Sequence, residues 1–135
     1  MSRDLAELAI TAGLQRYCTA VDTYDAVLFQ ALWTTDAQLD FGERYQGGPA
    51  GFMASLVEAR SRTIAMSHEL EEVSIDVSSD LASATSLSIV SAVVIRVGED
   101  GEQRRLVRGR YEDRWVLNDG QWLMQHRRYR ATSAI

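Results

Sequence analysis

The chain has 135 residues, of which 46% are hydrophobic and 24% charged, so it is long enough for one globular domain with a proper core. Its net charge is -5, and its arginines are mixed with acidic residues, which excludes a nucleic-acid-binding surface. The lone Cys18 excludes an intramolecular disulfide, and no signal peptide or membrane-spanning run is present. We therefore expect a soluble, cytoplasmic protein with neither a nucleic-acid nor a membrane partner.

The first part of the chain predicts two helices joined at a tight corner. Asp4 can cap a helix that runs to about Val21, because apolar residues recur at spacings of three and four. Thr23 or Asp25 can cap a second helix, which we expect to end near Trp33, before two threonines that favour a strand. This corner places the carboxylate of Asp22 where two helices meet.

The remaining pattern predicts a short strand, a third helix and four long strands. Residues 37–41 alternate as a strand does, and Pro49 begins a helix whose apolar face includes Phe52 and Leu56. Val, Ile, Ser, Thr and aromatic residues then dominate four segments separated by turns that contain Gly or Asp: 66–77, 83–97, 102–117 and 121–131. Helices followed by mostly antiparallel strands predict an α+β fold in which a curved sheet wraps over the helices and leaves a pocket.

Two residues distant in the sequence can form a catalytic pair. The chain has two histidines, so a base of ordinary pKa is His68, His126 or a perturbed carboxylate. His68 lies where the third helix gives way to the sheet, from which its side chain can enter the concave side facing Asp22. A carboxylate there would fix the imidazole tautomer and favour the imidazolium. The alternative is structural, with Asp22 as a helix cap and His68 as a strand-end residue.

Four stretches resemble the SnoaL-like branch of the nuclear transport factor 2 superfamily, over nearly the whole chain: QRYCTAVDTYDAVLFQALWTTDAQLDF, GGP before a helix, SHELEEVSI and GRYEDRWVLNDGQWLMQHR. Their layout is similar to that of hexachlorocyclohexane dehydrochlorinases and scytalone dehydratases. Those enzymes eliminate with an Asp-His pair inside a cone-shaped α+β barrel. The resemblance implies that Asp22 and His68 are the catalytic pair and that Arg127 holds the leaving group.

The chain also departs from these families. The two water-orienting tyrosines of the dehydratases correspond to Val21 and Phe41, and their second histidine corresponds to about Arg108. Ketosteroid isomerases share the QRY start, with Tyr17 at their oxyanion-binding tyrosine and Asp113 near their hydrogen-bonding acid. Their catalytic aspartate falls on Phe41, which weakens the isomerase interpretation.

Each further candidate has a structural alternative. Tyr17 can be a core tyrosine, and Arg127 can lie at a solvated strand end. Asp113 shares a strand face with Tyr111, so both would enter the pocket together, or Asp113 would pair with an arginine on the next strand. His126 differs from Arg127 in strand parity, and we expect it to point outward.

The resulting hypothesis is a cofactor-independent lyase that acts on a small, mostly apolar and cyclic molecule. His68 would abstract a proton, Asp22 would orient the His68 ring and stabilise its positive charge, and Arg127 with Tyr17 would stabilise the departing group. We expect further substrate contacts from two places, the predicted 37–41 strand and the strand face of Tyr111: Leu39, Phe41, Tyr111 and Asp113.

Other functions stay open. One alternative is an isomerase or polyketide-type cyclase with Asp113 or Asp22 as a single acidic base, and another is a non-catalytic protein that binds a small hydrophobic molecule. The sequence has no spacing typical of a metal or nucleotide site, so we expect no metal and no cofactor. A long exposed sheet face favours a homodimer or homotrimer.

Overall fold

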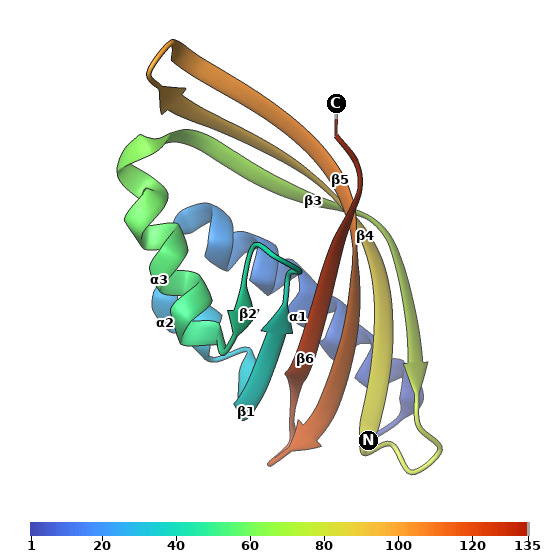
Figure 1. Cartoon of the computed structure of the whole chain (residues 1–135). Helices are drawn as coiled ribbons and strands as arrows, with labels where there is room; N and C mark the ends of the chain where they lie inside the picture. The colour runs from blue at the N-terminus through green and yellow to red at the C-terminus, as the bar shows by residue number, and fades with distance from the viewer. Residues whose placement is uncertain (135) are drawn as a thin grey trace.

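The computed structural model describes residues 1–134 as three helices and one six-stranded sheet (Figure 1). In chain order the elements are α1 (Arg3–Thr23), α2 (Ala26–Gln30), β1 (Trp33–Asp40), β2 (Gln46–Gly47), α3 (Pro49–Ala59), a 3-10 turn η1 (Arg60–Arg62), β3 (Thr63–Val77), β4 (Ser83–Gly98), β5 (Gly101–Asn118) and β6 (Gln121–Ala134). The strand order is β2-β1-β6-β5-β4-β3, and only the β1–β6 pair is parallel. The predicted α+β class is confirmed.

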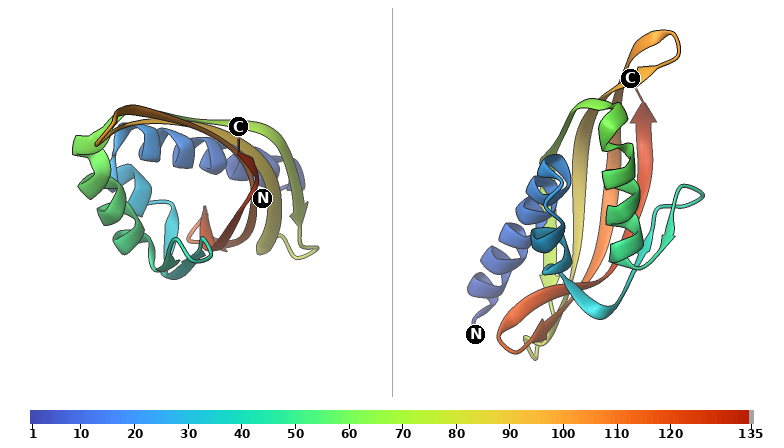
Figure 2. Two further views of the ribbon diagram at one scale, coloured as in Figure 1. Left: turned by 45° about the horizontal axis from the view of Figure 1, so that its top comes forward. Right: turned by 90° about the vertical axis from the view of Figure 1, so that its left-hand side faces the viewer.

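The sheet curves over the helices without closing into a complete barrel. Figure 2 (left) shows the strands arching above α1, with α2 and α3 on the same, concave side. The register has one extra residue in β3, between Leu70 and Glu72, and one in β6, between Met124 and His126, and these β-bulges help the strands to bend. The β4–β5 hairpin extends beyond α3 at one end of the molecule (Figure 2, right). This arrangement leaves room between the sheet and the helices.

The helix termini follow the local capping chemistry, with two corrections to the prediction. The side chain of Ser2, not Asp4, caps α1, where it accepts a hydrogen bond from Leu5 N at 3.1 Å. Asp25 caps α2 as predicted. Trp33 begins β1 instead of ending α2. The reason is that the carbonyl of the preceding residue, Leu32, accepts a hydrogen bond from the backbone N–H of Met124 in β6, so the chain has joined the sheet at this point. No helix within residues 1–134 is long and apolar enough to cross a membrane.

The core lies between α1 and the concave face of the sheet. Trp33, Trp115 and Trp122 are buried. Gly13 allows α1 to approach the sheet closely, because a Cβ atom at this position would lie 2.8 Å from the Trp115 ring. Tyr17, one turn further along α1, packs against Trp33 and Tyr111 in edge-on aromatic contacts. These contacts fix α1, and with it Asp22, against the sheet.

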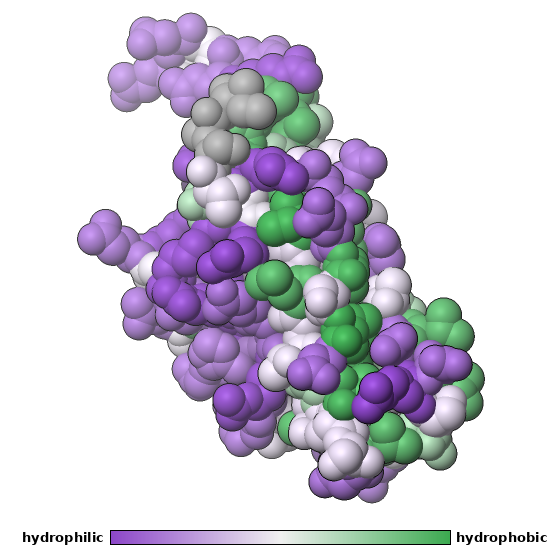
Figure 3. Space-filling model, turned by 90° about the vertical axis from the view of Figure 1, so that its right-hand side faces the viewer, coloured by the Kyte–Doolittle hydropathy of each residue, from purple (hydrophilic) through white to green (hydrophobic). Residues whose placement is uncertain are grey.

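The convex face of the sheet carries a band of partly exposed apolar side chains. Leu87 and Val97 are 40% and 54% exposed. Strand alternation and register place four further apolar residues on the same face: Ile89, Val93, Ile95 and Leu106. Figure 3 looks onto the side turned away from α2 and α3 and shows hydrophobic residues beside a strongly hydrophilic area.

Candidate functional site

A cavity of about 210 Å³ lies between the concave face of the sheet and the helices. Its walls come from α1, α3, the segment that follows β1, and strands β3, β4, β5 and β6. Most of the lining is apolar, and includes Val21, Phe52, Leu56, Met66, Val90 and Val94. A cavity of this size takes a molecule smaller than a typical drug.

The predicted pair of Asp22 and His68 forms at the wall of this cavity. Asp22 lies in the last turn of α1, and His68 lies on β3 on the same strand face as Met66. The Nδ1 atom of His68 is 2.6 Å from Asp22 Oδ1, and the backbone N–H of His68 donates to Asp22 Oδ2 at 2.8 Å. His68 lines the cavity, whereas Asp22 lies behind it. The side chains are 16% and 22% exposed.

This geometry defines the proton positions on the imidazole. One oxygen of Asp22 contacts Nδ1 of His68 and the other accepts the backbone N–H, and an ionised carboxylate can only accept hydrogen bonds, so in the neutral form of the imidazole the proton lies on Nδ1 and the lone pair on Nε2. A histidine whose second nitrogen is held by a carboxylate is suited to act as a general base. The arrangement therefore places a candidate base at the edge of an enclosed, mostly apolar space.

Arg127 is placed differently from the prediction. It donates two hydrogen bonds to Asp113, from Nε to Oδ1 at 2.7 Å and from Nη2 to Oδ2 at 2.9 Å, and the two side chains are 1% and 0% exposed. Its guanidinium carbon lies 4.2 Å from the centre of the Tyr17 ring and 3.7 Å from that of Tyr111. Arg127 does not line the cavity. Neither the predicted contact with a leaving group nor the alternative of a solvated strand end describes Arg127. It is instead the arginine on the next strand with which Asp113, in its own structural alternative, was expected to pair.

Electrostatics keep Arg127 charged. Burial is the largest single effect and lowers its pKa, but the charge and hydrogen bonds of Asp113, with smaller contributions from Tyr111 and Tyr17, together raise the pKa of Arg127 above its usual value. Asp113 also accepts a hydrogen bond from Ser86 Oγ at 3.2 Å, and Trp115 Nε1 donates to that same Oγ at 2.9 Å. The sequence analysis missed this network. Its signal was the pair Ser86 and Ser88, which interrupts an apolar alternation on the inward face of β4.

Two tyrosines lie between the buried ion pair and the cavity. Tyr17 and Tyr111 line the cavity, and each is 2% exposed. Burial raises the pKa of Tyr17 to about 12, although the Arg127 charge acts against the rise. Burial also raises the pKa of Tyr111 well above its usual value. Both phenols are therefore neutral at physiological pH, and each keeps its hydroxyl proton.

Leu39 of β1 and Phe41, which directly follows β1, differ in position. Phe41 lines the cavity, where its ring stacks against Tyr129. Leu39 is 1% exposed but does not line the cavity. The reason is its register in the sheet, which places Leu39 beside Arg127 in the packed core. The prediction of a substrate contact is thus kept for Phe41 and withdrawn for Leu39.

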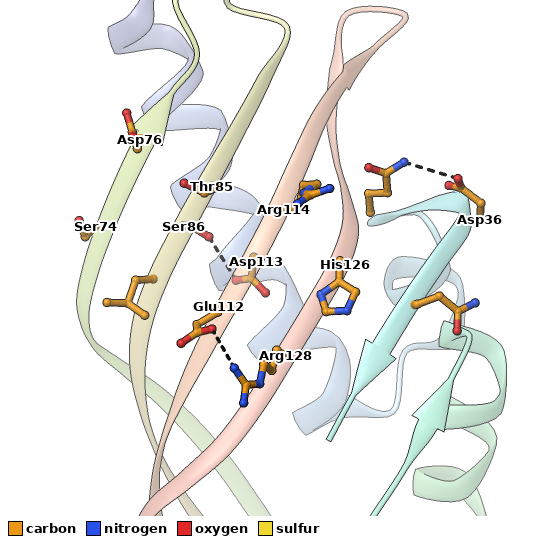
Figure 4. A pocket seen from close by; sticks show the side chains of 13 residues that line it. Asp36, Ser74, Asp76, Thr85, Ser86, Glu112, Asp113, Arg114, His126 and Arg128 are labelled. Carbon is orange, nitrogen blue, oxygen red and sulfur yellow. Dashed lines mark hydrogen bonds and ion pairs between the residues drawn. The ribbon is translucent and has the colours of Figure 1, made fainter. Parts of the chain in front are cut away.

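A second hollow, of about 730 Å³, lies on the opposite face of the sheet (Figure 4). In that view α1 lies behind the strands, and Glu112, His126 and Arg128 lie around the hollow. Arg128 pairs with Glu112 at 3.6 Å. His126 is exposed, as its strand parity predicted. This hollow has charged side chains beside the apolar Leu87, and it lies outside the space that the helices and sheet enclose.

Metal binding has no evident set of ligands. Among the described residues, no three His, Cys, Asp or Glu side chains gather closely enough to hold a metal ion. Besides His68, the basic side chains of the described residues on the cavity wall are three arginines, Arg44, Arg96 and Arg105.

Comparisons with known proteins agree with this fold. Residues 3–128 match the model of the SnoaL-like domain. A candidate scytalone dehydratase of Novosphingobium aromaticivorans superposes with a TM-score of 0.85 at 24% identity, over 98% of this chain and 88% of the other. A hexachlorocyclohexane dehydrochlorinase of Novosphingobium barchaimii superposes with a TM-score of 0.77 at 20% identity, over 98% of this chain and 92% of the other.

A nuclear transport factor 2-like protein of Salmonella enterica superposes with a TM-score of 0.84 at 17% identity, over 98% of this chain and 94% of the other. A comparison with curated proteins gives no match. At these identities the solved structures establish the shared fold, and the chemistry has to be argued from the site itself.

Proposed function

Because the chain belongs to the SnoaL-like domain family, we propose that it is a cofactor-independent lyase that eliminates water or a hydrogen halide from a small, largely apolar and cyclic substrate. The observation that carries this proposal is the 2.6 Å contact between Asp22 and His68 at the wall of the cavity. Structural neighbours of the chain include a candidate dehydratase and a dehydrochlorinase, which supports the same class of reaction.

The proposed step is a base-promoted elimination. Nε2 of His68 takes a proton from the carbon next to the one that carries the leaving group. The electrons of the broken C–H bond form the new double bond, and the leaving group departs with the electrons of its own bond. Asp22 stabilises the imidazolium that results. Tyr17 and Tyr111, in place of Arg127, would donate hydrogen bonds to the departing hydroxide or halide.

The histidine mechanism is favoured over an isomerase or cyclase with a single acidic base. Asp113 is held by Arg127 and Ser86, and both oxygens of Asp22 are bound to His68. Among the described residues, the cavity lining includes no aspartate or glutamate. A carboxylate base would therefore have to leave existing hydrogen bonds before it could reach a substrate.

Turnover of small cyclic alcohols and halides tests the proposal. A panel of such compounds, each with an acidic hydrogen beside the leaving group, is incubated with the protein, and new conjugated double bonds are followed by ultraviolet absorbance. His68→Ala should lower the rate by roughly 10²- to 10⁴-fold, the usual contribution of a general base. The matched control is His126→Ala, because this second histidine is exposed on the other side of the sheet.

Two results would contradict the proposal. One is a substrate that His68→Ala converts as fast as the unchanged protein does. The other is retention of compounds in the cavity with no turnover of any, which would favour the alternative of a non-catalytic binding protein.

A further inference from the structure

The cavity is apolar at its inner end and positively charged at its outer end. The inner lining consists of side chains that are at most 2% exposed, such as Tyr17, Val90 and Tyr111. At the outer end, Arg44 and Arg105 are exposed and Arg96 is half-buried, and all three line the cavity. A chain with a net charge of -5 thus places three arginines on this wall.

The fold directs these side chains to one place. Val90, Val94 and Arg96 share the inward face of β4, and Arg96 pairs with Gln103 while Val94 pairs with Arg105. Arg96 and Arg105 are therefore diagonal neighbours on one face of the sheet, and long side chains in these positions can reach each other. Both arginines lie toward the tip of the β4–β5 hairpin that extends beyond α3 (Figure 2, right).

Arg44 reaches the same region from the turn between β1 and β2. Burial raises the pKa of Tyr129, and the charges of Arg44 and Arg105 both act against that rise. Their guanidinium groups therefore lie near one tyrosine on the cavity wall, although they come from distant parts of the chain.

These three arginines have no acidic partner in the part of the chain that the structure describes. The ion pairs there use six other arginines: Arg62, Arg108, Arg110, Arg127, Arg128 and Arg130. The Nε atom of Arg96 is buried and has no hydrogen-bond partner among the described residues. Three like charges near an apolar cavity repel one another, and a buried donor without a partner is costly. An anionic ligand would relieve both.

We propose that the substrate carries a carboxylate, which Arg44, Arg96 and Arg105 bind at the outer end of the cavity while the apolar body fills the inner end. A guanidinium group matches a carboxylate in charge and in the spacing of its two donors. This inference rests on the proposed function. It adds the substrate class, and it implies that the arginines fix the end of the molecule that does not react while His68 acts on the apolar part.

A pair of uncharged and charged probes tests the inference without turnover. The probes are 4-methylbenzoate and 4-methylbenzyl alcohol, which differ in the carboxylate, and their dissociation constants are measured by NMR titration. The unchanged protein should bind the acid at least about tenfold more tightly than the alcohol, as expected for charge-assisted hydrogen bonds. Arg96→Gln and Arg105→Gln should each remove most of this preference and leave the affinity for the alcohol unchanged.

Arg104→Gln is the matched control, because Arg104 precedes Arg105 on β5, points to the other face of the sheet and forms no ion pair with the described residues. It should keep the preference for the acid. Equal binding of the two probes, binding of neither, or an equal loss in Arg104→Gln and Arg105→Gln would overturn the inference.

The proposed lyase activity is tested separately, by the effect of His68→Ala on turnover. His68-dependent turnover of neutral substrates alone would support the lyase activity and contradict a carboxylate-bearing substrate. Preference for the acid without His68-dependent turnover would support the carboxylate site and contradict the lyase activity.

Discussion

Asp22 holds His68 at two points, because one carboxylate oxygen contacts the ring Nδ1 and the other accepts the backbone N–H of the same residue. The second hydrogen bond fixes the carboxylate relative to the β3 backbone, so the ring contact does not depend on side-chain rotamers alone. A structural cap would use only backbone donors. The ring contact therefore distinguishes this aspartate from an ordinary corner residue.

The first prediction concerns the tautomer of His68. In the unchanged protein at neutral pH, any neutral imidazole should carry its proton on Nδ1. In Asp22→Asn, the side-chain amide can donate to Nδ1 while its oxygen accepts the backbone N–H, so the proton should move to Nε2 and remove the lone pair from the cavity. Turnover should fall by roughly 10²- to 10⁴-fold. Nitrogen-15 NMR of the imidazole rings measures the tautomer directly.

His126 is the internal reference in the same spectra, because it is the second of the two histidines and is exposed. Its signals should not change in Asp22→Asn. A proton on Nε2 of His68 in the unchanged protein would contradict the proposed role as a base.

The second prediction compares two buried serines on β4. Ser86 Oγ bridges Asp113 and Trp115, whereas Ser88 Oγ is buried without a partner among the described residues. Ser86→Ala should lower the free energy of unfolding by about 1–3 kcal/mol, because it leaves the Trp115 N–H unsatisfied. Ser88→Ala should leave stability unchanged or increased. Urea unfolding of both variants measures the difference, and equal effects would show that the network does not contribute.

The sequence predicted the order of elements well because local signals were strong. Pro49 begins α3 as expected, and the four long strands differ from their predicted limits by no more than three residues at either end, since Gly- and Asp-containing turns separate them. The two-residue strand β2 was not predicted, because a segment so short shows no alternation. The start of β1 at Trp33 was also missed, since pairing with β6 overrides the local helical pattern.

The candidate site was predicted in part. Strand parity correctly placed Tyr111 and Asp113 on one inward face and His126 outward. The expectation that Tyr111 and Asp113 would enter the pocket together was wrong, because Tyr111 lines the cavity whereas Asp113 pairs with Arg127 outside it. The burial of Arg127 could not be inferred from the sequence, because the run HRRYR has the composition of a solvated strand end. Only the strand register, which pairs Arg127 with Asp113, shows that this charge belongs to the core.

The third prediction concerns that buried ion pair. Asp113→Asn leaves the Arg127 charge buried with no carboxylate, and should lower the free energy of unfolding by about 3–5 kcal/mol. Replacing both residues, as in Asp113→Leu with Arg127→Met, removes both buried charges and should cost much less. Thermal or urea unfolding of the single and double variants tests this non-additivity. A double variant less stable than Asp113→Asn would contradict it.

The fourth prediction concerns alkaline pH. Burial raises the pKa of Cys18 from 9.0 to about 11 and that of Tyr17 from 10.0 to about 12. Both groups lose their protons more readily in the unfolded chain, so their stabilising effect is complete below pH 9 and is lost as the pH rises to about 12. Between pH 8 and pH 10, Cys18 alone should account for a loss of about 1 kcal/mol.

Urea unfolding at several pH values measures this slope, and Cys18→Ala provides the comparison. The variant should lose less stability than the unchanged protein over the same pH range, whatever its stability at pH 8. Identical slopes would show that the Cys18 thiol does not titrate differently on unfolding.

The last prediction concerns assembly. We propose that the chain forms a homodimer or homotrimer through the convex face of the sheet, where the partly exposed apolar band around Leu87 would be covered. Light scattering after size-exclusion chromatography should then give two or three times the chain mass of 15.1 kDa. Leu87→Asp should give the single-chain mass, because it would place a charge in the apolar contact.

Val27→Asp is the matched control, since Val27 is 83% exposed but lies on α2, on the other side of the sheet. A monomeric unchanged protein, or a loss of assembly only in Val27→Asp, would contradict this surface as the interface.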